Sequence, residues 1–233
     1  MIRSTLFAFL LILGPYATAG VLVLQDGLNG HFSTEETQIK LFNPDTNFGP
    51  GGTFGADAGG IQGLLRFTNL IGTGVNQIDA GVSVQSAALT LHVTNSSSTN
   101  PTVHQMLVDW NENGLTWNNA AATGNGTAGF QADNIDAKSA SIGAFPASTL
   151  GDAVLDITDV VQNWVNGEAN HGLLFLSSSL DAAEFASSNN DFHVRPRLVI
   201  EYTSVPAPAG LGIFLLGLMA IWSRRNRIQN LAG

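Results

Sequence analysis

A period-two alternation of apolar and polar residues is the feature of this chain that most constrains its fold. Leu89, Leu91 and Val93 occupy alternate positions, and the polar Thr90 and His92 lie between them. Because successive side chains of a strand point to opposite faces, this pattern predicts a strand with one buried and one solvated face. A sheet with one buried face needs a second layer, so the pattern favours an all-β fold of packed sheets.

Four further segments have strand character. Two are continuous apolar runs, as expected of central strands, and two alternate like the first. The continuous runs are residues 63–67 and 173–176, and the alternating segments are 103–110, with Met106, Val108 and Trp110 inward, and 197–202, with Leu198, Ile200 and Tyr202 inward.

One segment has helical character instead. Residues 155–165 place four apolar side chains on one helical face, with Thr158 or Asp159 as the N-cap and Gly167 as the stop. The four side chains are Val160, Val161, Trp164 and Val165. We therefore predict an all-β, jelly-roll-like antiparallel β-sandwich with one short helix, formed by residues 20–204.

Charge and cysteine content exclude several classes of protein. Charged residues make up 12% of the chain and Cys is absent, which excludes a coiled coil, a disulfide scaffold and a Cys-ligated metal site. All 18 acidic residues lie in the predicted domain, whereas four of the nine basic residues lie at the chain ends, so the domain carries 18 negative and five positive charges, a net of −13. Nucleic acid is therefore excluded as a partner.

The N-terminal residues are typical of a secretory signal peptide. Arg3 precedes an apolar run at residues 6–13, and Ala17 and Ala19 supply small side chains before Gly20. The apolar run is too short to span a bilayer, which takes about 20 residues. We predict a signal peptide over residues 1–19, cleaved between Ala19 and Gly20, and hence an exported protein.

The C-terminal residues 205–233 are typical of a membrane-sorting segment. An apolar run at residues 209–222 is followed by Arg224, Arg225 and Arg227. This predicts a transmembrane helix with a cytoplasmic basic end and the preceding domain outside. The protein is then associated with the membrane at least transiently.

The motif before that run is Val205-Pro206-Ala207-Pro208. Together with the apolar run and the Arg-rich end it resembles the PEP-CTERM sorting signal, although Ala207 stands where that family most often has Glu. The resemblance implies processing by an exosortase-like membrane protease, with Arg224 and Arg225 in the terminal basic cluster. It also implies delivery to the cell surface or exopolysaccharide matrix of a Gram-negative bacterium. Release and permanent anchoring both remain open, because of Ala207.

Seven short segments in the middle of the chain follow one another in a recognisable order: residues 47–49, 64–67, 87–91, 110–119, 156–164, 170–175 and 195–198. In this order, over residues 33–202, they resemble the DNRLRE family of exported β-sandwich domains, which overlaps carbohydrate-binding module family 96. The resemblance implies a non-catalytic module, and some members bind acidic polysaccharides such as alginate.

Two aromatic and three basic residues of these segments are candidate carbohydrate-binding residues. Trp110 and Trp117 flank a turn and form either a sugar-stacking platform or a buried clamp for the loop. Arg66, Arg195 and Arg197 either meet carboxylate sugars or form structural salt bridges. The acidic surface favours the salt bridges, because it repels a polyanion.

Acidic residues suggest two further sites. Asp45 and Asp57 bracket a Gly-rich loop and are candidate ligands for a structural calcium ion, the single cofactor that we consider. A glycan hydrolase needs a pair of carboxylates, and the candidates are Asp109 with Glu112, and Asp152, Asp156 and Asp159. The sequence contains no established catalytic motif. The five histidines share no metal-ligand spacing, and we expect the rings of His92 and His104 to be solvated.

The sequence thus predicts a non-enzymatic exported protein of the cell surface or matrix, sorted by an exosortase-like system and associated with exopolysaccharide. The first alternative is a carbohydrate-binding module for an alginate-like or neutral polysaccharide. The second is a glycan-active hydrolase.

Overall fold

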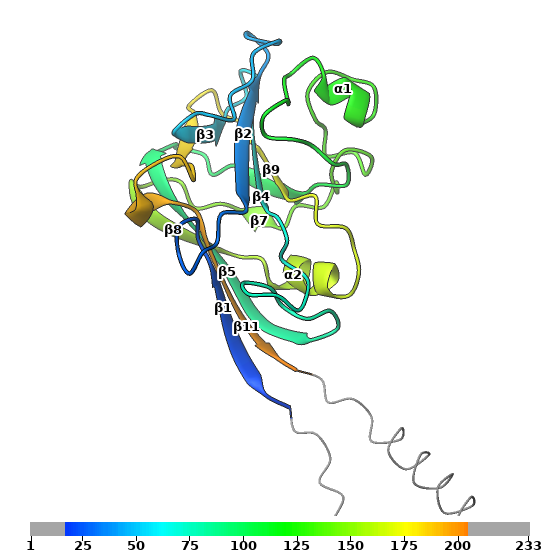
Figure 1. The fold of residues 1–233 in the computed structure, drawn as a ribbon. Helices are drawn as coiled ribbons and strands as arrows, with labels where there is room; N and C mark the ends of the chain where they lie inside the picture. Colours follow the sequence, from blue (N-terminus) through cyan, green and yellow to red (C-terminus); the bar gives the residue numbers. More distant parts are fainter. Residues whose placement is uncertain (1–16, 205–233) are drawn as a thin grey trace, which may run out of the picture. The chain divides into compact units, whose positions relative to one another are not determined.

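The alternating segments form two antiparallel sheets in the computed structural model, which describes residues 17–204 (Figure 1). The six-stranded sheet has the order β1-β11-β5-β10-β3, and β8 pairs with β5 off this path. Its strands are β1 (Ala19–Leu24), β3 (Thr53–Ala56), β5 (Ser83–Asn95), β8 (Gly151–Asp156), β10 (Ala183–Ala186) and β11 (Arg197–Thr203).

The five-stranded sheet has the order β2-β4-β9-β6-β7. Its strands are β2 (Thr34–Lys40), β4 (Ile61–Phe67), β6 (Thr102–Gln105), β7 (Gly143–Ala144) and β9 (Leu173–Leu176). The two continuous apolar runs are β4 and β9, which lie inside this sheet, so the prediction of central strands is confirmed.

The inner faces of the two sheets share one hydrophobic core. Phe54 of the six-stranded sheet meets Phe175 of the five-stranded sheet edge to face, with ring centroids 5.7 Å apart. Leu89, Leu91 and Val93 of β5 are buried in the same core, as their alternation predicts. The chain is therefore mostly β, with two sheets packed on each other. The jelly-roll connectivity stays a prediction.

The predicted helix is α2 (Thr158–Val165), and its four apolar residues are buried. The predicted N-cap is wrong, because Ile157 holds that position and makes no side-chain cap bond. The Thr158 hydroxyl instead accepts a hydrogen bond from the Ala87 backbone N–H (2.9 Å) and donates to Asp156 (2.5 Å), which ties α2 to β5. A single turn, α1 (Ala120–Thr123), and a 3-10 turn, η1 (Phe192–Val194), were not predicted.

One strand prediction needs correction. The strand expected at residues 103–110 ends at Gln105, because the Leu107 N–H turns to the Asp136 carbonyl (2.8 Å) and the chain leaves the sheet. In β11, Leu198 and Ile200 are buried and the half-buried Tyr202 packs against the core, as predicted.

The prediction of solvated histidine rings is wrong for His104. This residue lies in β6, is 6% exposed and has both ring nitrogens within hydrogen-bond distance of Lys138 and Thr102 oxygens. His92 lies in β5 of the other sheet and is half-buried.

No helix within residues 17–204 is long and apolar enough to cross a membrane. The predicted transmembrane helix, the sorting motif and the apolar part of the signal peptide lie outside the described residues.

Candidate functional site

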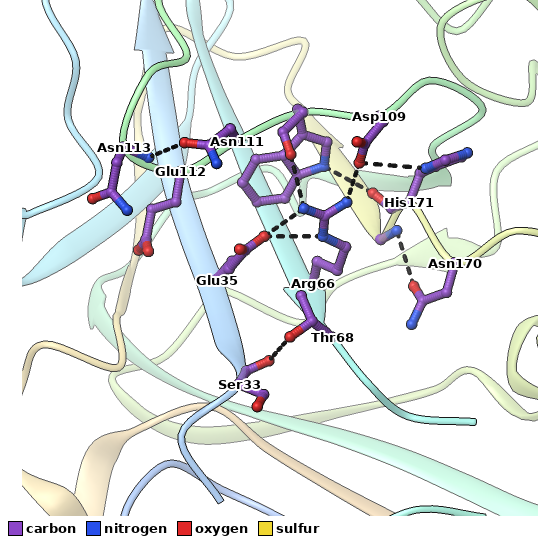
Figure 2. A network of polar contacts seen from close by, with 12 residues as sticks. Ser33, Glu35, Arg66, Thr68, Asp109, Asn111, Glu112, Asn113, Asn170 and His171 are labelled. Atoms are coloured by element: carbon purple, nitrogen blue, oxygen red, sulfur yellow. Dashed lines mark hydrogen bonds and ion pairs between the residues drawn. The ribbon is translucent and has the colours of Figure 1, made fainter. Parts of the chain in front are cut away.

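Arg66 of β4 is the centre of a polar network between β2, β4 and the loop after β6 (Figure 2). Its Nε and Nη2 donate to Glu35 Oε2 (3.0 and 2.5 Å), Nη2 donates to the Trp110 carbonyl (2.8 Å), and Nη1 is ion-paired with Asp109. The guanidinium also lies 4.9 Å from the Trp110 ring centroid. Burial opposes the charge, but the hydrogen bonds to Glu35 and Asp109 outweigh it and raise the pKa of Arg66. With 11% of its side chain exposed, Arg66 has a structural role.

The two candidate tryptophans do not form an exposed platform. Trp110 is 3% exposed, and its indole N–H donates to the His171 carbonyl (2.8 Å). Trp117 is half-buried. It packs against Gly129 and against a second hydrophobic cluster, separate from the core between the sheets, that includes Leu115 and Phe130. The burial of both residues favours the loop clamp over the sugar platform.

The basic residues of the described part of the chain differ in what they contact. Four of them have partners: Lys40 lies over the Phe48 ring, Arg66 pairs with Glu35 and Asp109, Lys138 pairs with Glu168 (2.8 Å), and Arg195 donates to the carbonyls of Asn190 (2.9 Å) and Asp26 (3.1 Å). Arg197 is exposed, and its side chain makes no hydrogen bond, ion pair or ring contact with residues 17–204. An unpaired guanidinium is suited to bind a ligand carboxylate through two parallel hydrogen bonds.

The register of the six-stranded sheet places polar residues around Arg197. Arg197 of β11 pairs with Thr90 of β5, and two positions further along β5 His92 pairs with Asp152 of β8. Since Leu89 and Leu91 point into the core, Thr90 and His92 point away from it, and so do the residues directly opposite them. The His92 Nδ1 lies 2.7 Å from Asp152 Oδ1.

These residues line a hollow of about 200 Å³ on the outer face of the sheet, which we call the Arg197 hollow. Its lining is Gln25, Thr90, His92, Asp152, Phe192, His193, Arg195 and Arg197. The ring of Phe192, in η1, is 39% exposed, and its backbone is held by Gln25, whose Nε2 donates to the Phe192 carbonyl (2.8 Å). The hollow thus combines a free guanidinium, a hydroxyl group, a carboxylate paired with His92 and an exposed aromatic residue.

A larger groove of about 580 Å³ adjoins Arg66, Asp109 and Trp164. Much of its polar lining is already used inside the protein: Asn170 donates to the Phe67 carbonyl (2.8 Å), and Glu168 accepts from Lys138 and Gln105. The groove offers no free guanidinium, because Arg66 is paired, although the indole N–H of Trp164 has no hydrogen-bond partner among residues 17–204.

The candidate catalytic carboxylates have mainly structural partners. Hydrogen bonds from Thr158 lower the pKa of Asp156, and the Arg66 hydrogen bond lowers the pKa of Asp109. Burial raises the pKa of Glu112, whose carboxylate accepts the Glu36 N–H (3.3 Å). A general acid needs a raised pKa together with a second carboxylate across a cleft. Asp152 lies in the Arg197 hollow, whereas Asp156 and Asp159 line a different hollow.

The candidate calcium ligands belong to two different turns. Asp45 accepts from the Asn118 amide (2.8 Å), and Asp57 accepts from the Ile61 N–H (3.1 Å). Over residues 17–204, no group of three or more potential metal ligands is found. Calcium binding at Asp45 and Asp57 stays a prediction.

The predicted cleavage site is placed in a strand. Ala17 is exposed, whereas Ala19 and Gly20 are the first two residues of β1 and pair with Thr203 and Tyr202 of β11. The sorting residues Val205, Pro206, Ala207, Pro208, Arg224 and Arg225 lie outside the described residues.

Of the five candidate carbohydrate-binding residues, the structure brings Arg195 and Arg197 together at the hollow. The sequence analysis missed Thr90, His92 and Phe192 as site residues and named Asp152 only as a candidate catalytic carboxylate. The alternation of β5 does indicate that Thr90 and His92 are exposed, but no local pattern pairs them with residues about 60 or 100 positions away.

A two-sheet β fold with a shallow polar hollow and an exposed ring on one sheet face is typical of a surface binding module. The comparison with protein families makes this specific. The model of carbohydrate-binding module family 96 matches residues 32–202, so the chain belongs to that family. No curated protein matches the chain. The expected resemblance is thereby confirmed for carbohydrate-binding module family 96, whereas the DNRLRE family and the PEP-CTERM signal stay predictions.

Proposed function

We propose that this protein binds a polysaccharide outside the cell through the Arg197 hollow. Membership of a carbohydrate-binding module family supports binding rather than catalysis. The observation that carries the site is Arg197, the one basic residue between positions 17 and 204 that has no partner. This places the carbohydrate-binding alternative ahead of a purely structural matrix role, and a hydrolase stays the least supported reading.

The hollow supplies three kinds of contact to a sugar. Arg197 binds a carboxylate through two hydrogen bonds, which are stronger than those between neutral groups. Thr90 and Asp152 bind hydroxyl groups, and the ring of Phe192 packs against the apolar face of a pyranose. Gln25 and Arg195 bind backbone carbonyls around η1 and so hold this surface in place before a ligand arrives.

Replacing Arg197 by alanine is expected to weaken binding to a recognised acidic polysaccharide by about tenfold or more, since hydrogen bonds to charged groups contribute about 1.5–3 kcal/mol. Affinity electrophoresis on a panel of neutral and acidic glycans, followed by calorimetry on the retarded ones, measures the loss. Lys138→Ala is the matched control, because it also removes one positive charge, in this case from a half-buried lysine that lines another hollow. An equal loss in both variants would show a nonspecific charge effect, and retardation by no glycan would contradict the function itself.

We also propose that the protein is exported, processed by signal peptidase and sorted by an exosortase-like protease. The support is in the sequence of its two ends. The structure adds a condition: cleavage between Ala19 and Gly20 has to precede the pairing of β1 with β11, because a peptidase needs an extended, unpaired segment. Since β11 is the last strand of the domain, β1 has no partner until nearly the whole domain has been exported.

N-terminal sequencing of the protein recovered from the cell surface is expected to begin at Gly20. Mass spectrometry of the same sample shows whether residues from Val205 onward have been removed. A protein found in the cytoplasm with Met1 retained would contradict export.

A further inference from the structure

Carboxylates surround Arg197 on the outer face of the six-stranded sheet. Thr90 pairs with Arg197 on one side and with Val154 of β8 on the other, so these three residues form one row across the sheet. Asp152 and Asp156 lie two positions before and after Val154, about 7 Å away along the strand and on the same face. Both aspartates are exposed.

A third carboxylate lies on β11 itself. Glu201 is exposed and four positions beyond Arg197, on the same face and about 13 Å along the strand. Arg197 therefore shares one sheet face with several carboxylates, in a domain of net charge −13. Arg195, the other arginine of the hollow, is bound to the carbonyls of Asn190 and Asp26. A ligand that extends along the strands in either direction from Arg197 meets a carboxylate.

The surface between these charges is apolar. Val154 is 53% exposed and Val21 is 64% exposed. Val23 and Val199 pair with each other across β1 and β11 and are half-buried. Such a surface suits the uncharged faces of sugar rings. Apart from Arg197 and Arg195, the lining of the hollow contains no Lys or Arg of residues 17–204.

We infer that the Arg197 hollow selects a polysaccharide with isolated carboxylates in an otherwise uncharged chain and rejects chains that carry a carboxylate on each sugar. This inference rests on the proposed function and names its ligand class. One carboxylate is bound by Arg197, and the neighbouring neutral sugars lie over the valines and donate hydroxyl hydrogen bonds to Asp152 and Glu201. A polyuronate bound in the same place sets its next carboxylates against those same acids, and like-charge juxtaposition opposes binding.

Matched probes test this directly. Pectin with most of its carboxylates methyl-esterified and polygalacturonate share one backbone, as do propylene-glycol-esterified alginate and alginate. The intact domain is expected to bind each esterified chain about tenfold more tightly than its fully charged counterpart, because several surface charges each contribute a factor of about two to five. Raising the salt concentration is expected to weaken binding of the esterified chains and to strengthen binding of the polyuronates, since it screens attraction in one case and repulsion in the other.

Amino-acid substitutions test which carboxylates cause the discrimination against polyuronates. Asp152→Asn combined with Glu201→Gln is expected to strengthen polygalacturonate binding by about fourfold relative to the esterified chain, since each removed surface repulsion contributes a factor of about two. The amide oxygens of the variant still accept hydrogen bonds from sugar hydroxyls, so the ratio of the two affinities, rather than the affinity for the esterified chain alone, is the readout. Asp133→Asn, in the loop between α1 and β7, removes a charge away from this face and is expected to change neither.

The outcomes separate the inference from the function. Polygalacturonate or alginate binding at least as tightly as the esterified chain, in an Arg197-dependent way, would overturn the selectivity and leave carbohydrate binding in place. Binding of neither esterified chain would also overturn the inference, and the wider glycan panel then decides the proposed function. Equal gains from Asp133→Asn and from the double variant would show that only net charge matters.

Discussion

Arg66→Met is expected to lower the free energy of unfolding by about 2 kcal/mol, since it removes the centre of a partly buried network of ion pairs and hydrogen bonds. The variant leaves Glu35 without either hydrogen bond from the guanidinium and the Trp110 carbonyl without its donor. It also removes the cation that stacks on the Trp110 ring. Methionine fills a similar volume and leaves little cavity, so the lost stability measures the contribution of the polar network. Urea unfolding at neutral pH measures it.

Lys138→Met is the matched control for this prediction. It breaks the ion pair with Glu168, in which the side chains are 33% and 47% exposed, and is expected to cost less than about 1 kcal/mol. Arg66→Lys is expected to fall between the two, because an ammonium keeps the charge but cannot bind Glu35, Asp109 and the Trp110 carbonyl together. Similar losses for Arg66→Met and Lys138→Met would contradict a structural role for the network.

Arg66 and Arg197 show where sequence reasoning stops. Both are arginines of predicted strands, and both were equally good candidates for sugar binding. What separates them is that the partners of Arg66 come from β2 and from the loop after β6, 31 and 43 positions away in the sequence, whereas Arg197 has none among the described residues. Charge pairing at that distance follows from strand order, which alternation alone does not determine.

The strands that were predicted correctly are those whose own sequence shows a strand pattern of apolar residues. β5 shows the period of two, and β4 and β9 show continuous apolar runs, so the local sequence was sufficient. β2, with the sequence TEETQIK, was missed because its polar residues are nevertheless buried. Glu36 and Thr37 are each 1% exposed, covered by loops far away in the sequence. The tertiary partners, rather than the hydrophobic pattern, determine the burial of β2.

Glu36 carries the second large expected effect. The Ser188 backbone N–H donates to its Oε1 (3.1 Å) and the Ser188 hydroxyl to its Oε2 (2.7 Å). Burial is the main cause that raises the pKa of Glu36 to about 8; the Ser188 hydrogen bonds oppose it, and the nearby carboxylates of Glu112 and Asp26 add to it. The buried carboxyl group is therefore mostly protonated at neutral pH.

The sign of the resulting pH dependence follows from linkage. The folded state holds the Glu36 proton more tightly than the unfolded state, whose pKa is 4.5, so the contribution of this group to stability is fully present below about pH 4.5 and is lost as the pH rises through about 8. One pKa unit corresponds to about 1.4 kcal/mol. The free energy of unfolding is expected to fall by about 2 kcal/mol between about pH 6 and about pH 8 on account of Glu36 alone.

Glu36→Gln is expected to abolish this fall, because the amide has no proton to lose. Its oxygen accepts the Ser188 N–H, and its NH2 donates to the Ser188 hydroxyl, which can both donate and accept. The variant should be the more stable protein at about pH 8 and above, where the wild type has to bury a carboxylate beside Glu112. Denaturant unfolding across this pH range measures both curves. Glu184→Gln, on β10, removes a half-buried carboxylate that has no hydrogen bond to the described residues, and it should leave the wild-type slope unchanged. A slope that persists in Glu36→Gln would mean that a different group binds the proton on folding, with Glu112 the first to test, since burial raises its pKa as well.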